Sequence, residues 1–206
     1  MTWKETWRLL RADLRRRLEL EGCGLNPLTL AACLLHRGTW AAMAYRVNHY
    51  LLLKGWRRFV RLSELLFVLI SRSEIHAGAE IGPGLVITDR GGVGVPAFAR
   101  IGRNCCFLGP SLLTLGAVSG VDLSQDHIIL GDHCVIGPGA RLLGAIRLGH
   151  GIQVKANSVV ITSFEKPGQI VAGIPARRRG TVALETVQRW NPWRAEWLSR
   201  PAAPSY

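Results

Sequence analysis

Between residues 130 and 160 the chain reads LGDHCVIGPGARLLGAIRLGHGIQVKANSVV, in which an aliphatic residue returns at every sixth position. Glycine follows that residue at Gly131, Gly137 and Gly149. A six-residue unit suffices for one short strand and one turn, and three units close a triangular coil of about eighteen residues. The aliphatic side chains then stack inside the coil, and glycines fit the corners, where backbones approach closely. The period therefore predicts a parallel β-helix.

The same count extends upstream. The frame slips by two residues after Val93, and the irregular stretch Thr114–Ile129 interrupts it again. No 3.6-residue period runs through this region, which excludes a helical bundle there. We therefore expect a left-handed β-helix from about Ile75 to about Phe164. The expected inward residues are Ile75, Ile81, Ile87, Val93, Ile101, Phe107, Leu113, Leu130, Ile136, Leu142, Leu148, Val154 and Val160.

The flanks of the repeat differ from it. Before it, apolar residues fall at helical spacing, Asn26-Pro27 marks a helix start, and Trp56–Ile70 is typical of an amphipathic helix. After it, three tryptophans within Trp190–Trp197 predict a short helix that packs back on the coil. We expect a mainly β protein in three parts: a domain of three or four helices over 1–70, the β-helix over 71–170, and a C-terminal tail over 171–206.

The chain is strongly basic, with 26 Lys and Arg against 14 Asp and Glu and a net charge of +12. This surplus favours anionic partners such as phosphates, an acidic carrier protein or an anionic membrane, and a solvated basic surface is the alternative. No nucleic-acid-binding motif is present, so we expect no nucleic-acid partner. Five cysteines without metal-ligand spacing predict buried thiols and no metal site.

We also expect no signal peptide and no membrane-spanning segment. The N-terminus is charged and lacks the apolar run of a signal peptide. The longest apolar run, Leu62–Ile70, is too short to span a membrane. We expect a cytoplasmic protein that does not cross a membrane, and contact with a membrane surface stays open.

Three stretches, IHAGAEIG at residues 75–82, IGPGA at 136–140 and AGIPA at 172–176, resemble the serine acetyltransferase-type hexapeptide acyltransferases. The helical segment AYRVNH at residues 44–49 adds to this resemblance, which covers roughly residues 28–180. It implies CoA-dependent acyl transfer, with acetyl-CoA in the groove between adjacent β-helices. It also implies a homotrimer, in some members a dimer of trimers, and a histidine that deprotonates the acceptor hydroxyl.

This chain departs from the family at the positions to which the resemblance assigns chemistry. Where the family has an Asp-His pair that includes the general base, this chain has Asp89-Arg90. Arginine is no base near neutral pH because its pKa lies above about 12. Arg90 either binds an acidic group of the acceptor or a CoA phosphate, with Asp89 beside it, or marks a lost active site. Glu74 occupies the position of the carboxylate that orients the family's base.

The family's second histidine matches His127, which is therefore the candidate general base. Asp122 or Asp126, from the same irregular stretch, is expected to orient its imidazole ring. Asp126 stands where the family has an arginine that binds the serine carboxylate. The expected cofactor-binding residues are Gly116, Pro138, Lys155, Ala156, Arg177 and Arg178.

The leading hypothesis is an acetyl-CoA-dependent O-acetyltransferase that acts on a hydroxyl acceptor. A sugar, a polysaccharide precursor or another metabolite is favoured over free serine, because the substitutions affect both the base and the carboxylate anchor. Two alternatives stay open. One is a genuine serine O-acetyltransferase in which Arg90 holds the carboxylate, and the other is a catalytically degenerate trimeric scaffold.

Overall fold

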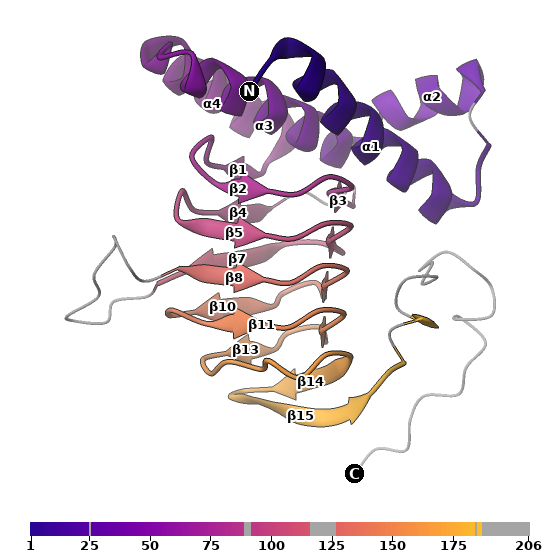
Figure 1. Cartoon of the computed structure of the whole chain (residues 1–206), viewed down its shortest axis with the longest axis vertical. Coiled ribbons are helices and arrows are strands. Elements are labelled where there is room, and N and C mark those ends of the chain that lie inside the picture. The colour runs from indigo at the N-terminus through magenta and orange to yellow at the C-terminus, as the bar shows by residue number, and fades with distance from the viewer. Residues whose placement is uncertain (25, 89–91, 116–126, 184, 187–206) are drawn as a thin grey trace.

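The structure is a computed structural model of the 206-residue chain, and it describes residues 1–24, 26–88, 92–115, 127–183 and 185–186. In this part of the chain, four helices cover one end of a column of short strands (Figure 1). The helices are α1 (Trp3–Glu21), α2 (Pro27–Leu34), α3 (Arg37–Leu53) and α4 (Arg57–Ser71). The expected helix start at Asn26-Pro27 is confirmed, since the Asn26 side chain accepts from the Thr29 N–H and caps α2.

The described strands form three sheets, one on each side of a triangular coil. The first sheet contains β1 (Glu74–Ile75), β4 (Val93–Val95), β7 (Ser111–Thr114), β10 (Arg141–Leu143) and β13 (Val159–Val160). The second contains β2 (Glu80–Ile81), β5 (Ala99–Ile101), β8 (Ile128–Leu130) and β11 (Arg147–Leu148). The third contains β3 (Val86–Ile87), β6 (Cys106–Phe107), β9 (Val135–Ile136), β12 (Gln153–Val154), β14 (Gln169–Gly173) and β15 (Ala176–Thr181). All pairs are parallel except β14 with β15, so the predicted β-helix is confirmed.

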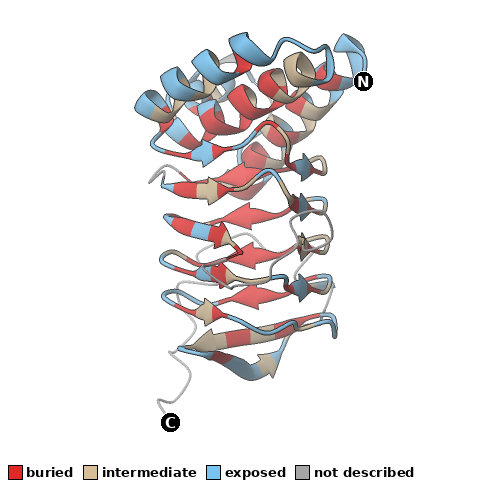
Figure 2. Cartoon of the chain, turned by 90° about the vertical axis from the view of Figure 1, so that its left-hand side faces the viewer, coloured by how far each residue is buried: buried red, intermediate tan, exposed pale blue. Residues whose placement is uncertain are grey.

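The core is the interior of this coil, as the red strands in Figure 2 show. All thirteen residues that the six-residue period predicts to point inward are buried in one continuous cluster. Along the third sheet, for example, Ile87 pairs with Phe107, which in turn pairs with Ile136. Burial of each such side chain contributes about 1.5–3 kcal/mol, so the stack is the main source of stability.

Strand register locates the two interruptions of the period. Ile75 pairs with Val95, twenty residues later, whereas Val93 pairs with Ser111, eighteen residues later. The two additional residues therefore lie before Val95, and the expectation that the slip follows Val93 is wrong. Both Val93 and Val95 are buried, because the two ends of β4 point inward. The second interruption lies between β7 and β8, as expected, and Ile101 pairs with Leu130 across it.

Glycine at the corners is required by the next coil. A Cβ atom on Gly102 would lie 2.7 Å from the backbone carbonyl carbon of Gly131. A Cβ atom on Gly131 would lie at the same distance from that of Gly149. Real Cβ atoms do not approach backbone this closely, which explains why glycine follows the inward aliphatic residue.

A buried ion pair joins the helices to the first coil. Arg46 on α3 donates from Nε to Asp13 on α1 over 2.8 Å, and its two terminal nitrogens donate to the carbonyls of Ile81 and Gly82. The Asp13 carboxylate also accepts from the Gly84 and Leu85 amides. Burial raises the pKa of Asp13, against the opposing effect of Arg46 and the two amides. The helices are thus attached to the β-helix by polar contacts as well as by packing.

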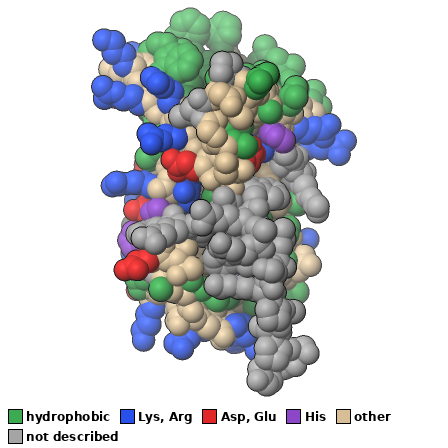
Figure 3. Space-filling view, turned by 90° about the vertical axis from the view of Figure 1, so that its right-hand side faces the viewer, with side chains coloured by type: hydrophobic (Ala, Val, Ile, Leu, Met, Phe, Trp, Pro, Cys, Tyr) green, Lys and Arg blue, Asp and Glu red, His purple; other side chains and the backbone are tan. Residues whose placement is uncertain are grey.

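The outer surface is uneven. Figure 3 shows hydrophobic side chains gathered at the helical end of the molecule, with Lys and Arg beside them. Among the described residues, no helix is long and apolar enough to cross a bilayer. The predicted Trp190–Trp197 helix lies outside the described residues, and the division of the chain at residues 70 and 170 stays a prediction.

Candidate active site

The turns between the third and first sheets stack into one edge of the β-helix, here called the groove edge (residues 88, 92, 108–110, 137–140 and 155–158). Its turns are held by hydrogen bonds from coil to coil. The Gly137 N–H donates to the Val154 carbonyl over 2.8 Å, and the Lys155 N–H donates to the Val171 carbonyl over 2.9 Å. Pro138, Lys155 and Ala156, three of the residues expected to bind the cofactor, lie together on this edge.

A groove of about 710 Å³ follows the groove edge across the first sheet. Its volume lies within the range of about 300–1,000 Å³ that is common for small-molecule sites. It extends from the coil of Glu74 to that of Asn157, which at a strand spacing of about 4.8 Å gives a length of about 19 Å. It is lined by Val68, Arg72, Glu74, Gly92, Val93, Gly94, Pro110, Ser111, Leu112, Gly139, Ala140, Arg141 and Asn157.

Two cations and one carboxylate line this groove. Arg72, Arg141 and Glu74 are exposed, and within the described ranges neither guanidinium group forms an ion pair. Arg72 ends α4 in the left-handed region, with φ 54°, and its carbonyl accepts from the Gly92 N–H over 2.6 Å. The Ser111 hydroxyl is buried and has no hydrogen-bond partner among the described residues.

Other predicted residues lie at the ends of the groove or outside the described chain. Arg177 and Arg178 are exposed on β15, where they pair with Ala172 and Val171 at the end of the groove edge. Asp89 and Arg90, which precede Gly92 in sequence, lie outside the described residues. Gly116, Asp122 and Asp126 also lie outside them. Glu74 is the predicted acceptor-binding residue that the structure does place in the groove.

His127 lies elsewhere in the same chain. It is half-buried and directly precedes β8, in the second sheet. The groove is lined from the first sheet, the groove edge and the end of α4, and not from the second sheet. Among the described residues, His127 therefore does not line this groove.

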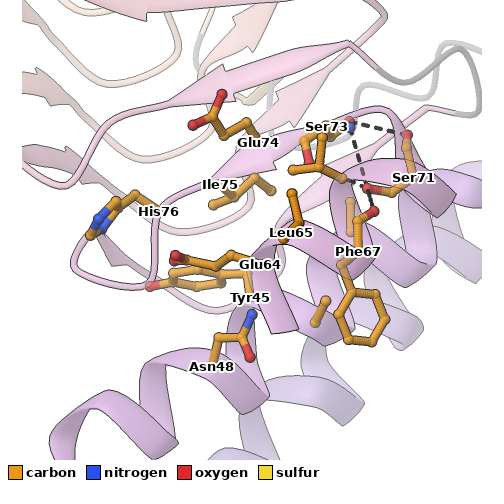
Figure 4. Close-up of a pocket in the computed structure, with 13 residues that line it drawn as sticks. Tyr45, Asn48, Glu64, Leu65, Phe67, Ser71, Ser73, Glu74, Ile75 and His76 are labelled. Carbon is orange, nitrogen blue, oxygen red and sulfur yellow. Dashed lines mark hydrogen bonds between the residues drawn. The ribbon is translucent and has the colours of Figure 1, made fainter. Parts of the chain in front are cut away.

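A second cavity, of about 380 Å³, lies between α3, α4 and the first coil (Figure 4). The Tyr45 hydroxyl donates to the Ala79 carbonyl over 2.7 Å, and Glu64 accepts from the Ala77 N–H over 2.8 Å. Burial raises the pKa of Tyr45 to about 12, so its phenol stays neutral at physiological pH. These polar groups hold the first coil against the helices, which indicates a structural cavity. Glu74 borders it, with the carboxylate pointing away from the helices (Figure 4).

The period could not predict Arg72, Arg141 and Ser111 as site residues. Arg72 precedes the first hexapeptide, and Ser111 and Arg141 occupy ordinary positions within the repeat. Only the register reveals that Ser111 and Arg141 lie in adjacent strands, since Leu112 pairs with Arg141.

A hexapeptide β-helix with a cationic groove along one edge defines the class of hexapeptide-repeat acyltransferases. Curated relatives agree with this class, although no protein-family model matches the chain. A serine acetyltransferase of Synechococcus elongatus is 32% identical over 171 residues, which are 83% of this chain and 68% of the relative. One from Helicobacter pylori is 33% identical over 144 residues, which are 70% of this chain and 82% of the relative.

Solved structures are similar over most of the chain. Neisseria gonorrhoeae serine acetyltransferase has a TM-score of 0.78 at 27% identity, over 91% of this chain and 71% of that one. The soybean enzyme complexed with serine has a TM-score of 0.73 at 32% identity, over 84% of this chain and 69% of the soybean chain. The Brucella abortus enzyme in complex with coenzyme A has a TM-score of 0.75 at 26% identity, over 88% of this chain and 70% of the Brucella chain. The chain belongs to the serine acetyltransferase family and is an O-acetyltransferase of that type.

Proposed function

We propose that the protein transfers the acetyl group of acetyl-CoA to the hydroxyl of an acceptor other than free serine. A sugar, a polysaccharide precursor or another hydroxyl-bearing metabolite is the acceptor class. The groove along the groove edge, with its cations, is the observation that carries this proposal.

The groove suits the acyl donor in length and charge. The groove is about 19 Å long, as judged from the strand spacing of about 4.8 Å, so an extended ligand such as CoA fits along it. Arg141, Lys155 and Arg177 are exposed along or at the end of the same edge, where they would meet the phosphates of CoA. The Brucella abortus relative in complex with coenzyme A supports this assignment of the donor.

His127 acts as the general base in this proposal. It takes the proton of the acceptor hydroxyl as that oxygen attacks the thioester carbonyl carbon. The tetrahedral intermediate carries its negative charge on the former carbonyl oxygen, which backbone N–H groups stabilise. The intermediate then releases the CoA sulfur, which leaves with the proton that His127 returns, and the acetyl ester remains on the acceptor.

The sequence at the acceptor end argues against free serine. Asp126 replaces the arginine that the family uses for the serine carboxylate, and two carboxylates repel each other. Arg72 at the head of the groove and Arg90 nearby in sequence offer cations at new positions. Serine itself is the second candidate acceptor, because the soybean relative is complexed with serine.

Helix α4 supports a homotrimer. Its inward side mixes Val60, Phe67 and Val68 with Ser63, Glu64 and Ser71, and its outward side exposes several large apolar side chains. The outward residues Phe59, Leu62, Leu66 and Leu69 are between 52% and 73% exposed and follow a three-four-three spacing. This spacing is typical of a helix that packs against copies of itself. We infer a trimer in which α4 forms a threefold seam and His127 of one copy serves the groove of the next.

The test measures thiol release from acetyl-CoA with a panel of hydroxyl acceptors that includes serine. We expect turnover with a non-serine acceptor, and a loss of about 10²- to 10⁴-fold in kcat for His127→Ala. Acetyl-CoA affinity, measured by calorimetry, should stay unchanged in this variant. His150→Ala is the matched control, since His150 is an exposed turn histidine away from the groove. Equal rates for wild type and His127→Ala would reject the role of His127, and serine as the best acceptor would favour the second candidate.

A further inference from the structure

A basic stripe runs along α1. Lys4, Arg8, Arg11 and Arg15 follow a four-three-four spacing, which places them on one face of the helix, and all four are exposed. Arg15 pairs with Glu19 over 3.2 Å, and for the other three the described residues provide no ion-pair partner. Four cations on one face attract a polyanion more strongly than isolated surface charges do.

Apolar side chains lie beside this stripe. A groove of about 760 Å³ between α1 and α2 is lined by Trp7, Leu14 and Leu30, with Arg8, Arg11 and Arg15 among its walls. On α2 and its C-terminal cap, Leu28 and Leu35 are 82% and 84% exposed. Trp3 and Trp7 are exposed and contact each other edge to face. Apolar side chains that are exposed together around one groove form a patch of the kind that binds a partner.

The positive charge of the stripe and the apolar residues beside it distinguish three candidate partners: a second copy, a nucleic acid and an anionic lipid surface. Pairing of two copies through this surface would place the two basic stripes against each other, and the repulsion disfavours it. A nucleic acid would satisfy the cations but leave the exposed leucines in water. An anionic lipid surface satisfies both, because basic side chains meet the headgroups while Trp and Leu enter the boundary with the acyl chains.

We propose that the α1–α2 surface, formed by the basic stripe together with Trp3, Trp7, Leu28, Leu30 and Leu35, docks on an anionic lipid bilayer. Docking is peripheral, since no described helix is able to cross a bilayer. In Figure 3 basic and hydrophobic side chains gather at the helical end, and in Figure 1 the β-helix extends away from that end. Docking does not depend on which acceptor is acetylated.

The test is co-sedimentation of the full chain with vesicles of phosphatidylcholine alone and of phosphatidylcholine mixed with phosphatidylglycerol. We expect binding only to the mixed vesicles, weakened by high salt. Arg8→Glu with Arg11→Glu should reduce it by at least about tenfold. Leu28→Asp with Leu35→Asp should also reduce binding to the mixed vesicles, although this change removes no cation. A blue shift of tryptophan fluorescence should accompany binding of the wild type.

The matched control is Arg103→Glu with Arg147→Glu, which makes the same change in charge at exposed arginines of the β-helix. Binding should persist in this control. No binding of the wild type to anionic vesicles would overturn the proposal, as would an equal loss in the control pair. Light scattering on the same variants tests whether a second copy occupies this surface instead. If the wild type does not bind vesicles and Arg8→Glu with Arg11→Glu forms smaller assemblies than the wild type, the lipid proposal is also rejected.

Discussion

At the scale of single residues, Asp13 and Arg46 are both charged groups with almost no contact with water. Removing such ions from water costs several kcal/mol each, and the loss is offset only where every polar atom finds a partner. Arg46 bonds to Asp13 and to two carbonyls of the first coil, and Asp13 bonds to two amides of the same turn. The pair therefore fixes where the helices sit on the β-helix.

Breaking this pair from one side should destabilise the protein strongly. We expect Arg46→Met to lower the free energy of unfolding by about 3–5 kcal/mol, because it leaves a buried carboxylate without its cation. Denaturant unfolding measures the change. Asp13→Leu combined with Arg46→Met should recover part of the loss, since no charge is then left buried. A double variant less stable than Arg46→Met would contradict this account.

Residues of the repeat were predictable one by one, whereas this pair was not. An inward position such as Ile136 and a corner such as Gly131 follow from a six-residue count alone. Asp13 and Arg46 lie on different helices, and no local pattern connects them. Only the packed structure reveals which charged residues become buried.

At the scale of elements, α4 exposes several leucines on its outward face, while its inward face mixes apolar residues such as Val60 with polar ones such as Ser71. Its amphipathic pattern was evident from the sequence, but a period does not state which side faces the protein. The Glu64 carboxylate decides it locally, because it accepts from the Ala77 N–H and so turns the polar side toward the first coil. The leucines of α4 stay exposed on the outward face, where the proposed trimer would bury them.

Polar substitution on this outward face should dissociate the trimer while each chain stays folded. We expect Leu62→Ser with Leu66→Ser to shift the molar mass toward that of a monomer, because the apolar seam is lost. Light scattering measures the mass, and circular dichroism checks the fold. Ile161→Ser is the control, since Ile161 is comparably exposed on a distant coil. A trimer that survives the double substitution would show that the seam lies elsewhere.

At the scale of the whole molecule, the groove and the candidate general base lie in two different places. The groove is built from the first sheet and the groove edge, whereas His127 precedes a strand of the second sheet. Sequence comparison placed Pro138, Lys155 and Ala156 on one edge because the register of a solenoid is regular. It could not place His127 relative to that edge, and the proposed trimer is what would bring His127 of one copy to the groove of the next.

Shared sites allow two defective chains to complement each other. We expect His127→Ala and Arg141→Glu to be weak enzymes separately, and the co-expressed pair to recover activity, because some interfaces then combine an intact His127 with an intact groove. Steady-state thiol release measures it. Arg141→Glu co-expressed with Arg72→Glu should recover nothing, since both changes damage the same groove. Absence of recovery in the first pair would place the whole site within one chain.

The insertion between β7 and β8 has an evolutionary consequence. Ile101 still pairs with Leu130 across it, and Leu130 pairs with Leu148 at the ordinary interval. A segment of any length inserted at one corner therefore leaves the strand pairing of the neighbouring coils unchanged. The scaffold can therefore be inherited intact while the sequence and length of this one segment diverge.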